Sequence, residues 1–117
     1  LSEAYTGDSK MLSPAVEYLK MHYSTDISNS VLASKCYISE EYFRKLFKKA
    51  YGVSPKQYVI DMRINMAKQL LSEGCLKINE IAKQCGFSNP YHFSRLFKEK
   101  TSETPSAFMK RNKICEM

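Results

Sequence analysis

Two parts of this chain repeat each other, and the repeat constrains the fold more than any other feature of the sequence. The matched segments of the first and second copy are residues 32–39 with 81–88, 43–48 with 93–98, Ser54-Pro55 with Thr104-Pro105, and Tyr58 with Phe108. The second copy holds one extra residue between its first two segments. A solenoid needs three or more repeats, so two copies indicate a duplicated structural unit.

Apolar residues recur at helical spacing along nearly the whole chain. Val16, Leu19 and Tyr23 follow an i, i+3, i+7 pattern, which predicts a first helix over about residues 13–23. The same reasoning predicts a short helix capped by Ser28, helices over about residues 39–51, 55–73, 78–85 and 89–101, and a last helix from residue 104. Residues that favour strands are sparse and do not alternate, so no strand is predicted.

Each copy of the repeat consists of a short helix, a tight turn and a longer helix, which is the helix-turn-helix pattern. The turn of the second copy holds Gly86, which tolerates a positive φ, whereas the first copy holds the less favourable Tyr37. The sequence therefore predicts an all-α fold of seven helices, with two helix-turn-helix subdomains joined by a long central helix. Helical hairpins are common, so this pattern alone leaves open whether the units bind DNA or only pack together.

The charge balance favours a polyanionic partner. Eighteen lysines and arginines oppose twelve acidic residues, which gives a net charge of +6. Such a balance suits nucleic acid or an anionic membrane surface. The membrane is disfavoured, because each helix needs its apolar face for the core and no apolar run exceeds three residues. A second hypothesis is a helical protein–protein adaptor whose basic face meets an acidic partner.

The sequence contains no pattern typical of catalysis, metal binding or cofactor binding. Paired acids, an activated nucleophile and a phosphate-binding loop are absent, so we do not expect an enzyme. The histidines fall in no ligand cluster and the cysteines form no C-x-x-C pair, so no metal or cofactor site is predicted. We expect the four cysteines to be small buried hydrophobic residues; they are Cys36, Cys75, Cys85 and Cys115.

The longer helix of each copy carries polar side chains opposite its aromatic residues. We expect Phe43, Phe47, Phe93 and Phe97 to lie in the core. The outward-facing or flanking residues are then Glu40, Glu41, Arg44, Lys45, Lys48 and Lys49 in the first copy, and Tyr91, His92, Ser94, Arg95, Lys98 and Lys100 in the second. Residues near the start of a recognition helix meet base edges, and the lysines further along are better placed for phosphates.

The predicted central helix has a suitable length for pairing the two units on DNA. Residues 55–73 span about 28 Å at 1.5 Å per residue. Successive major-groove faces on one side of B-DNA lie about 34 Å apart. A rigid connector of this length is expected to place two recognition helices in adjacent grooves.

Each copy of the repeat carries an ordered set of motifs. Those of the second copy are Ile81-Ala82, Gly86-Phe87, residues 93–98, Thr104-Pro105 and Phe108, and those of the first are Ala33, Ser39, Phe43-x-x-Leu46-Phe47-Lys48, Gly52, Ser54-Pro55 and Tyr58. With these motifs, residues 12–111 resemble the C-terminal DNA-binding domain of the AraC/XylS family of bacterial transcription regulators. The resemblance implies sequence-specific binding of double-stranded DNA by two helix-turn-helix units. In one departure, Ser102-Glu103 replaces the expected glycine, and we expect a looser turn there.

The resemblance also implies individual roles. The base-contacting residues are Glu41, Arg44 and Lys45 in the first unit, and Tyr91, His92, Ser94 and Arg95 in the second; the phosphate-contacting residues are Ser39, Lys48, Lys49, Asn89 and Lys98. Two alternatives stay open. Glu40 and Glu41 either complement the helix dipole or accept a hydrogen bond from a cytosine amino group. Arg95 either contacts DNA or bridges to Glu99.

The same resemblance predicts the partners and the domain limits. We expect a cytoplasmic regulator, an activator that contacts RNA polymerase, with no membrane partner and with an N-terminal effector or receiver domain that is missing from this chain. The expected divisions are a linker remnant at 1–10, a first helix-turn-helix subdomain at 11–53, a connecting helix at 54–74, a second subdomain at 75–111 and a C-terminal tail at 112–117.

Overall fold

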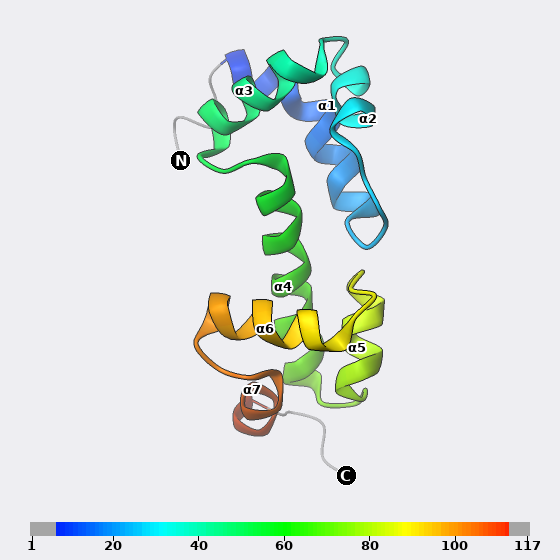
Figure 1. Ribbon diagram of the computed structural model, residues 1–117, viewed down its shortest axis with the longest axis vertical. Coiled ribbons are helices and arrows are strands. Elements are labelled where there is room, and N and C mark those ends of the chain that lie inside the picture. Colours follow the sequence, from blue (N-terminus) through cyan, green and yellow to red (C-terminus); the bar gives the residue numbers. More distant parts are fainter. Residues whose placement is uncertain (1–6, 113–117) are drawn as a thin grey trace. The chain divides into compact units, whose positions relative to one another are not determined.

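The computed structural model describes residues 7–112, which form seven helices and no strand (Figure 1). In chain order the helices are α1 (Gly7–His22), α2 (Asn29–Lys35), α3 (Glu40–Tyr51), α4 (Pro55–Glu73), α5 (Ile78–Gln84), α6 (Pro90–Thr101) and α7 (Pro105–Asn112). The predicted all-α fold is confirmed. Most of the expected linker remnant and C-terminal tail, and Cys115 with them, lie outside the described residues.

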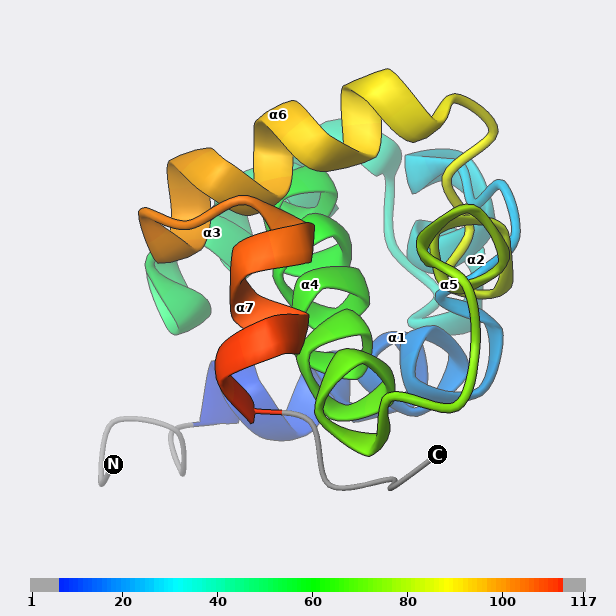
Figure 2. The ribbon, with the colours of Figure 1, turned by 90° about the horizontal axis from the view of Figure 1, so that it is seen from below.

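The chain forms two compact units, which divide within α4 between Asp61 and Met62. In the first unit α1, α2 and α3 pack against one another, and in the second α5 packs against α6 and α6 against α7. Figure 2 shows α5, α6 and α7 around the C-terminal half of α4. Each unit therefore contains one copy of the sequence repeat. Within residues 7–112, no helix is long and apolar enough to cross a membrane.

Most helices begin at the predicted capping residues. The side-chain oxygens of Ser28, Ser39, Ser54, Asn89 and Thr104 each accept a hydrogen bond from a backbone N–H in the first turn of the following helix. No cap was evident for α5, and this helix begins differently. There the Glu80 carboxylate accepts a hydrogen bond from the Lys77 backbone N–H at 2.9 Å.

The first helix begins earlier than the sequence pattern predicts. α1 starts at Gly7 rather than near residue 13, and Pro14 lies inside it. The prediction rested on the spacing of Val16, Leu19 and Tyr23, all of which follow Pro14 in the chain. The buried face of α1 extends past this point, since its members follow an i, i+3, i+4, i+7 pattern: Leu12, Ala15, Val16 and Leu19.

Each unit is centred on a buried phenylalanine of its longer helix. The ring centroid of Phe47 lies 5.6 Å from that of Phe43 and 5.3 Å from that of Tyr58, which meets it edge-on. In the second unit Phe97 lies 5.7 Å from Phe93 and 5.3 Å from Phe108, again edge-on. The four predicted core phenylalanines are fully buried, so that prediction is confirmed. The two units share one packing scheme.

The central helix buries only some of its apolar side chains. Val59, Met62, Met66 and Leu70 recur at helical spacing along α4 and are partly exposed. The buried residues are Pro55 at the start of the helix, and Ile64, Ala67 and Leu71 further along. The apolar residues of α4 lie on more than one side of the helix, so their spacing does not single out one stripe.

The paired turns of the two units share backbone conformations despite different residues. Tyr37 and Gly86 both have positive φ, at 60° and 101°. Gly52 and Ser102, which follow the longer helices, have φ of 79° and 69°. Left-handed backbone costs a residue with a side chain about 1–2 kcal/mol, whereas glycine has no such cost. The backbone is therefore strained at Tyr37 in the first unit and at Ser102 in the second.

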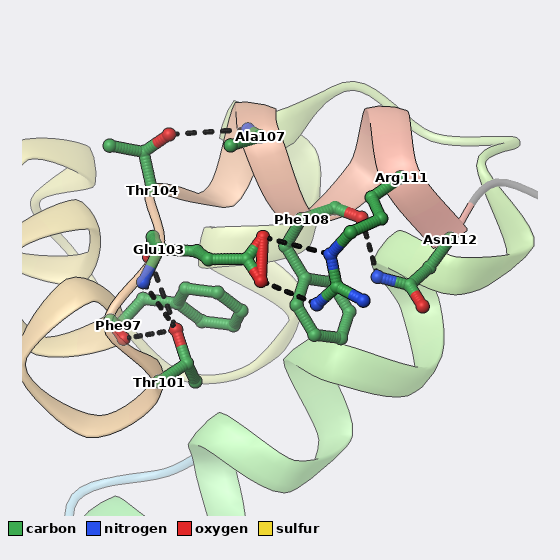
Figure 3. Close-up of polar contacts among 8 residues, drawn as sticks. All are labelled: Phe97, Thr101, Glu103, Thr104, Ala107, Phe108, Arg111 and Asn112. Carbon is green, nitrogen blue, oxygen red and sulfur yellow. Dashed lines mark hydrogen bonds and ion pairs between the residues drawn. The ribbon is translucent and has the colours of Figure 1, made fainter.

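Hydrogen bonds and an ion pair of neighbouring side chains stabilise the turn at Ser102, where we expected a looser turn (Figure 3). The Thr101 hydroxyl donates to the Phe97 carbonyl at 2.8 Å and accepts from the Glu103 N–H at 3.3 Å. The Glu103 carboxylate pairs with the Arg111 guanidinium, which raises the pKa of Arg111. Arg111 also lies over the Phe108 ring, 5.6 Å from its centroid. Serine therefore adopts the conformation that glycine has in the first unit.

Substitutions at the paired turns measure this backbone strain. Gly52→Ala should lower the free energy of unfolding by about 1 kcal/mol, because alanine disfavours a positive φ. An added Cβ at Gly52 meets no atom within 4 Å, so a steric clash does not contribute. Tyr37→Gly should raise the free energy of unfolding by about 0.5–1 kcal/mol, and Tyr37→Ala, which keeps the strain, serves as its control. Urea unfolding checks both, and equal stabilities of the Tyr37→Gly and Tyr37→Ala variants would refute the account.

Thiol reactivity should follow burial. Cys36 and Cys85 are buried as expected, and burial raises the pKa of both thiols, that of Cys85 to about 11. The expectation is wrong for Cys75, which is exposed in the connection between α4 and α5. A raised thiol pKa leaves less reactive thiolate at neutral pH. In the native protein at pH 8, iodoacetamide should modify Cys75 well before Cys36 or Cys85, as measured by peptide mass spectrometry. Equal rates for Cys75 and Cys85 would contradict the described packing.

Candidate nucleic-acid interface

The two faces of α3 differ in character. Phe43, Leu46 and Phe47 are buried on one side. The remaining polar side chains are all exposed; they are Glu40, Glu41, Arg44, Lys45, Lys48 and Lys49. The structure therefore brings the five predicted contact residues of α3 to its surface, with the predicted base contacts in the first half of the helix and the lysines in its last turn.

The surface of α6 repeats this arrangement with other residues. Tyr91, His92, Arg95 and Lys98 are exposed, and Tyr91 is 85% exposed. Ser94 differs from its predicted partners, because it is only partly exposed. It directly follows the buried Phe93, so it lies at the border of the buried face. Ser94 is therefore less available to a partner than its neighbours on α6.

The capping residues keep donors available at the helix starts. The Ser39 hydroxyl oxygen accepts from the Tyr42 N–H at 3.2 Å, which leaves the hydroxyl proton for a second partner. The Asn89 side-chain oxygen accepts from the N–H groups of Tyr91 and His92, at 2.8 and 3.4 Å. Its amide group retains two N–H donors. Both residues can therefore cap a helix and donate to a phosphate oxygen at the same time.

The charges at the starts of the two helices are arranged differently. The first turn of α3 holds Glu40 and Glu41, and Glu41 forms an ion pair with Lys45. The first turn of α6 holds no acid. Arg95 has no ion-pair partner within residues 7–112, and the alternative bridge to Glu99 is not formed there. A partner anion therefore has no carboxylate to displace at Arg95, whereas at Lys45 it competes with Glu41.

Two features near the recognition helices were not singled out by the sequence. The Arg63 guanidinium of α4 lies over the Phe87 ring, 5.7 Å from its centroid, and the edge of His92 meets the same ring at 6.4 Å. No local pattern marks Arg63, because Phe87 lies far along the chain. Tyr37, in the turn before α3, is 94% exposed. Its strained position in the repeat was visible, but nothing in the sequence indicated its exposure.

The described residues offer no candidate metal site. Between residues 7 and 112, no group of three or more histidine, cysteine, aspartate or glutamate side chains could hold a metal ion. The two exposed helix faces are therefore the candidate functional surface, and we call them the α3 face (Glu41, Arg44, Lys45, Lys48, Lys49) and the α6 face (Tyr91, His92, Arg95, Lys98).

Comparison with known proteins identifies relatives among transcription regulators. The chain is 37% identical over 101 residues to the regulatory protein PocR of Salmonella typhimurium, an alignment that covers 86% of this chain and 33% of PocR. The chain spans about a third to a half of the length of the first curated relatives it matches. The whole of such a relative is therefore much longer than this chain.

Solved structures match the fold along most of the chain. An AraC-type transcriptional regulator from Chromobacterium violaceum matches with a TM-score of 0.83 and 28% identity, over 91% of this chain and 95% of that one. The DNA-binding domain of the global transcriptional factor AdpA, solved in complex with a target DNA, matches with a TM-score of 0.80 and 26% identity, over 86% and 90% of the two chains.

A family model described as a helix-turn-helix domain matches residues 32–111. These residues run from the buried face of α2 to the end of α7, so the match includes both copies of the repeat. Together with the similarity to AraC-type structures, this match confirms the resemblance seen in the sequence. The chain belongs to the helix-turn-helix domain family and is an AraC-type DNA-binding domain.

Proposed function

We propose that this domain binds double-stranded DNA sequence-specifically by placing α3 and α6 in adjacent major grooves, and that it regulates transcription. The observation that carries the proposal is the repeated helix face, which is capped at its start, buries two phenylalanines and exposes long polar side chains. A solved relative, the AdpA domain, binds a target DNA. α4, at 19 residues or about 28 Å, suits a connector between neighbouring grooves.

We assign the recognition of DNA bases to side chains in the first half of α3 and of α6. Arginine and lysine donate to guanine O6 and N7, which makes Arg44, Lys45 and Arg95 the guanine-reading residues. Glu41 is an acceptor, and His92 and Tyr91 offer ring nitrogen and hydroxyl groups. Ser94, being partly exposed, contributes through its hydroxyl at the border of the α6 face. The exposed groups therefore supply both the donors and the acceptors that base edges require.

We assign the sequence-independent part of the DNA affinity to the lysines in the later turns of α3 and α6 and to the capping residues of both helices. Lys48 and Lys98 are equivalent in the repeat, exposed, and one turn beyond the base-reading residues. Their contact with phosphates releases counterions, which favours binding to any DNA sequence. Lys49 adds to this set on α3, and Ser39 and Asn89 donate to phosphate oxygens from the helix starts. Each helix is thereby anchored to the DNA backbone from its start and from its later turns.

The wider role follows from the length of the relatives. Because the chain spans only about a third to a half of the length of these curated relatives, we assign the parent protein an N-terminal effector or receiver domain. Several relatives are named transcriptional activators, which supports a role in activation. We include contact with RNA polymerase in the proposal. Such a regulator acts in the bacterial cytoplasm, where the chromosome and the polymerase are found.

Selection from random duplexes tests the arrangement on DNA. The 117-residue chain should enrich a motif with two short half-sites about 10 base pairs apart, centre to centre, because two units each read one groove. Sequencing the bound pool gives the result. A single short half-site would mean that only one unit reads sequence, and no enrichment at all would refute sequence-specific binding.

The assigned roles of Arg95 and Lys48 predict different losses. Arg95→Ala should weaken binding to the selected site by about 1–3 kcal/mol and relax the preference at one position, because a base-edge contact is lost. Lys48→Ala should weaken binding to all DNA sequences alike. It should also lower the slope of the logarithm of the association constant against the logarithm of the salt concentration by about one. Fluorescence anisotropy at several salt concentrations measures both. An unchanged motif in the first variant, or an unchanged slope in the second, removes that residue from its role.

A further inference from the structure

Glu41 and Lys45 present opposite charges side by side on the α3 face. Lys45 Nζ lies 3.7 Å from the nearer Glu41 carboxylate oxygen, and the lysine and glutamate side chains are 76% and 74% exposed. The residues are one helical turn apart, so their headgroups point the same way from the helix. The surface therefore carries an acceptor and a donor at a fixed, short separation.

The helix dipole does not account for this arrangement. Glu40 already places a carboxylate in the first turn of α3, and it has no ion-pair partner among the described residues. A further acid on a face that approaches DNA is repelled by phosphates. Such an acid is useful there only where a base edge offers it a donor. The pairing with Lys45 distinguishes Glu41 from Glu40 in this respect.

Base edges in the major groove differ in how donors and acceptors are ordered. A C·G pair displays the cytosine N4 amino group beside guanine O6 and N7, so its donor has an acceptor on one side only. An A·T pair displays the adenine N6 amino group between two acceptors, adenine N7 and thymine O4. A carboxylate at N6 meets acceptors on both sides. At N4 it meets an acceptor on one side, which is where a lysine can donate.

Resting on the proposed function, we propose that the Glu41–Lys45 pair makes the first unit selective for a C·G base pair. Glu41 accepts a hydrogen bond from the cytosine N4 amino group, and Lys45 donates to guanine O6 or N7. At an A·T pair the carboxylate at adenine N6 lies between two acceptors, and Lys45 can donate to only one of them. The pair therefore acts mainly by disfavouring wrong sequences. The α6 face, which has no acid in its first turn, lacks this restriction.

Two matched variants of the full chain test the pair. Glu41→Gln and Glu40→Gln each remove one negative charge from an exposed position in the first turn of α3. Both should therefore tighten binding to unrelated DNA to a similar degree. Only Glu41→Gln should lose its preference for C·G at one position of the selected motif, by about tenfold, and shift toward A·T, because glutamine pairs with adenine N6 and N7.

The outcomes separate this inference from the proposed function. Random-duplex selection on the wild type and both variants reads the motif, and circular dichroism confirms that each variant is folded. A two-part wild-type motif that Glu41→Gln leaves unchanged would overturn the inference and leave the proposed function standing. The same holds if Glu40→Gln alters the motif as much as Glu41→Gln does. Failure of the wild type to select any motif would overturn both.

Discussion

The burial of two phenylalanines one turn apart fixes how each recognition helix is rotated about its axis. Phe43 and Phe47 are fully buried on α3, as are Phe93 and Phe97 on α6. Burying one such side chain contributes about 1.5–3 kcal/mol, so each pair sets its helix firmly. With positions i and i+4 inward, positions i+1, i+2 and i+5 face out or flank. These are Arg44, Lys45 and Lys48 in α3, and Ser94, Arg95 and Lys98 in α6.

The same phenylalanines also hold the segment that follows each recognition helix. Tyr58 and Phe108 meet Phe47 and Phe97 edge-on, in both cases at 5.3 Å. To return to this contact the chain must reverse direction, and both units do so through a residue with positive φ. The first unit uses glycine, which adopts that conformation freely. The second uses serine and offsets its strain with the Thr101 hydrogen bonds and the Glu103–Arg111 ion pair.

Sequence reasoning succeeded where local chemistry decides the structure. The capping residues Ser39, Ser54 and Asn89 lie where helices begin, and the spacing of the aromatic residues correctly predicted the buried phenylalanines of both units. It failed where the tertiary environment decides. α1 continues through Pro14, with Leu12 packed in the core on the N-terminal side of the proline, and only packing selects Ile64, Ala67 and Leu71 among the apolar residues of α4. The contact of Arg63 with Phe87 left no sequence signal for the same reason.

The two units have similar backbone conformations but differ in the charged residues of their recognition helices. Phosphate contacts supply affinity without sequence information, and the repeat holds equivalent lysines for them at Lys48 and Lys98. The differences are concentrated in the first two turns, where α3 pairs Glu41 with Lys45 and α6 leaves Arg95 without an ion-pair partner among the described residues. A duplicated unit can diverge in this way because the outward positions take no part in its core. Selectivity can therefore change in one unit while the fold and the anchoring of both are kept.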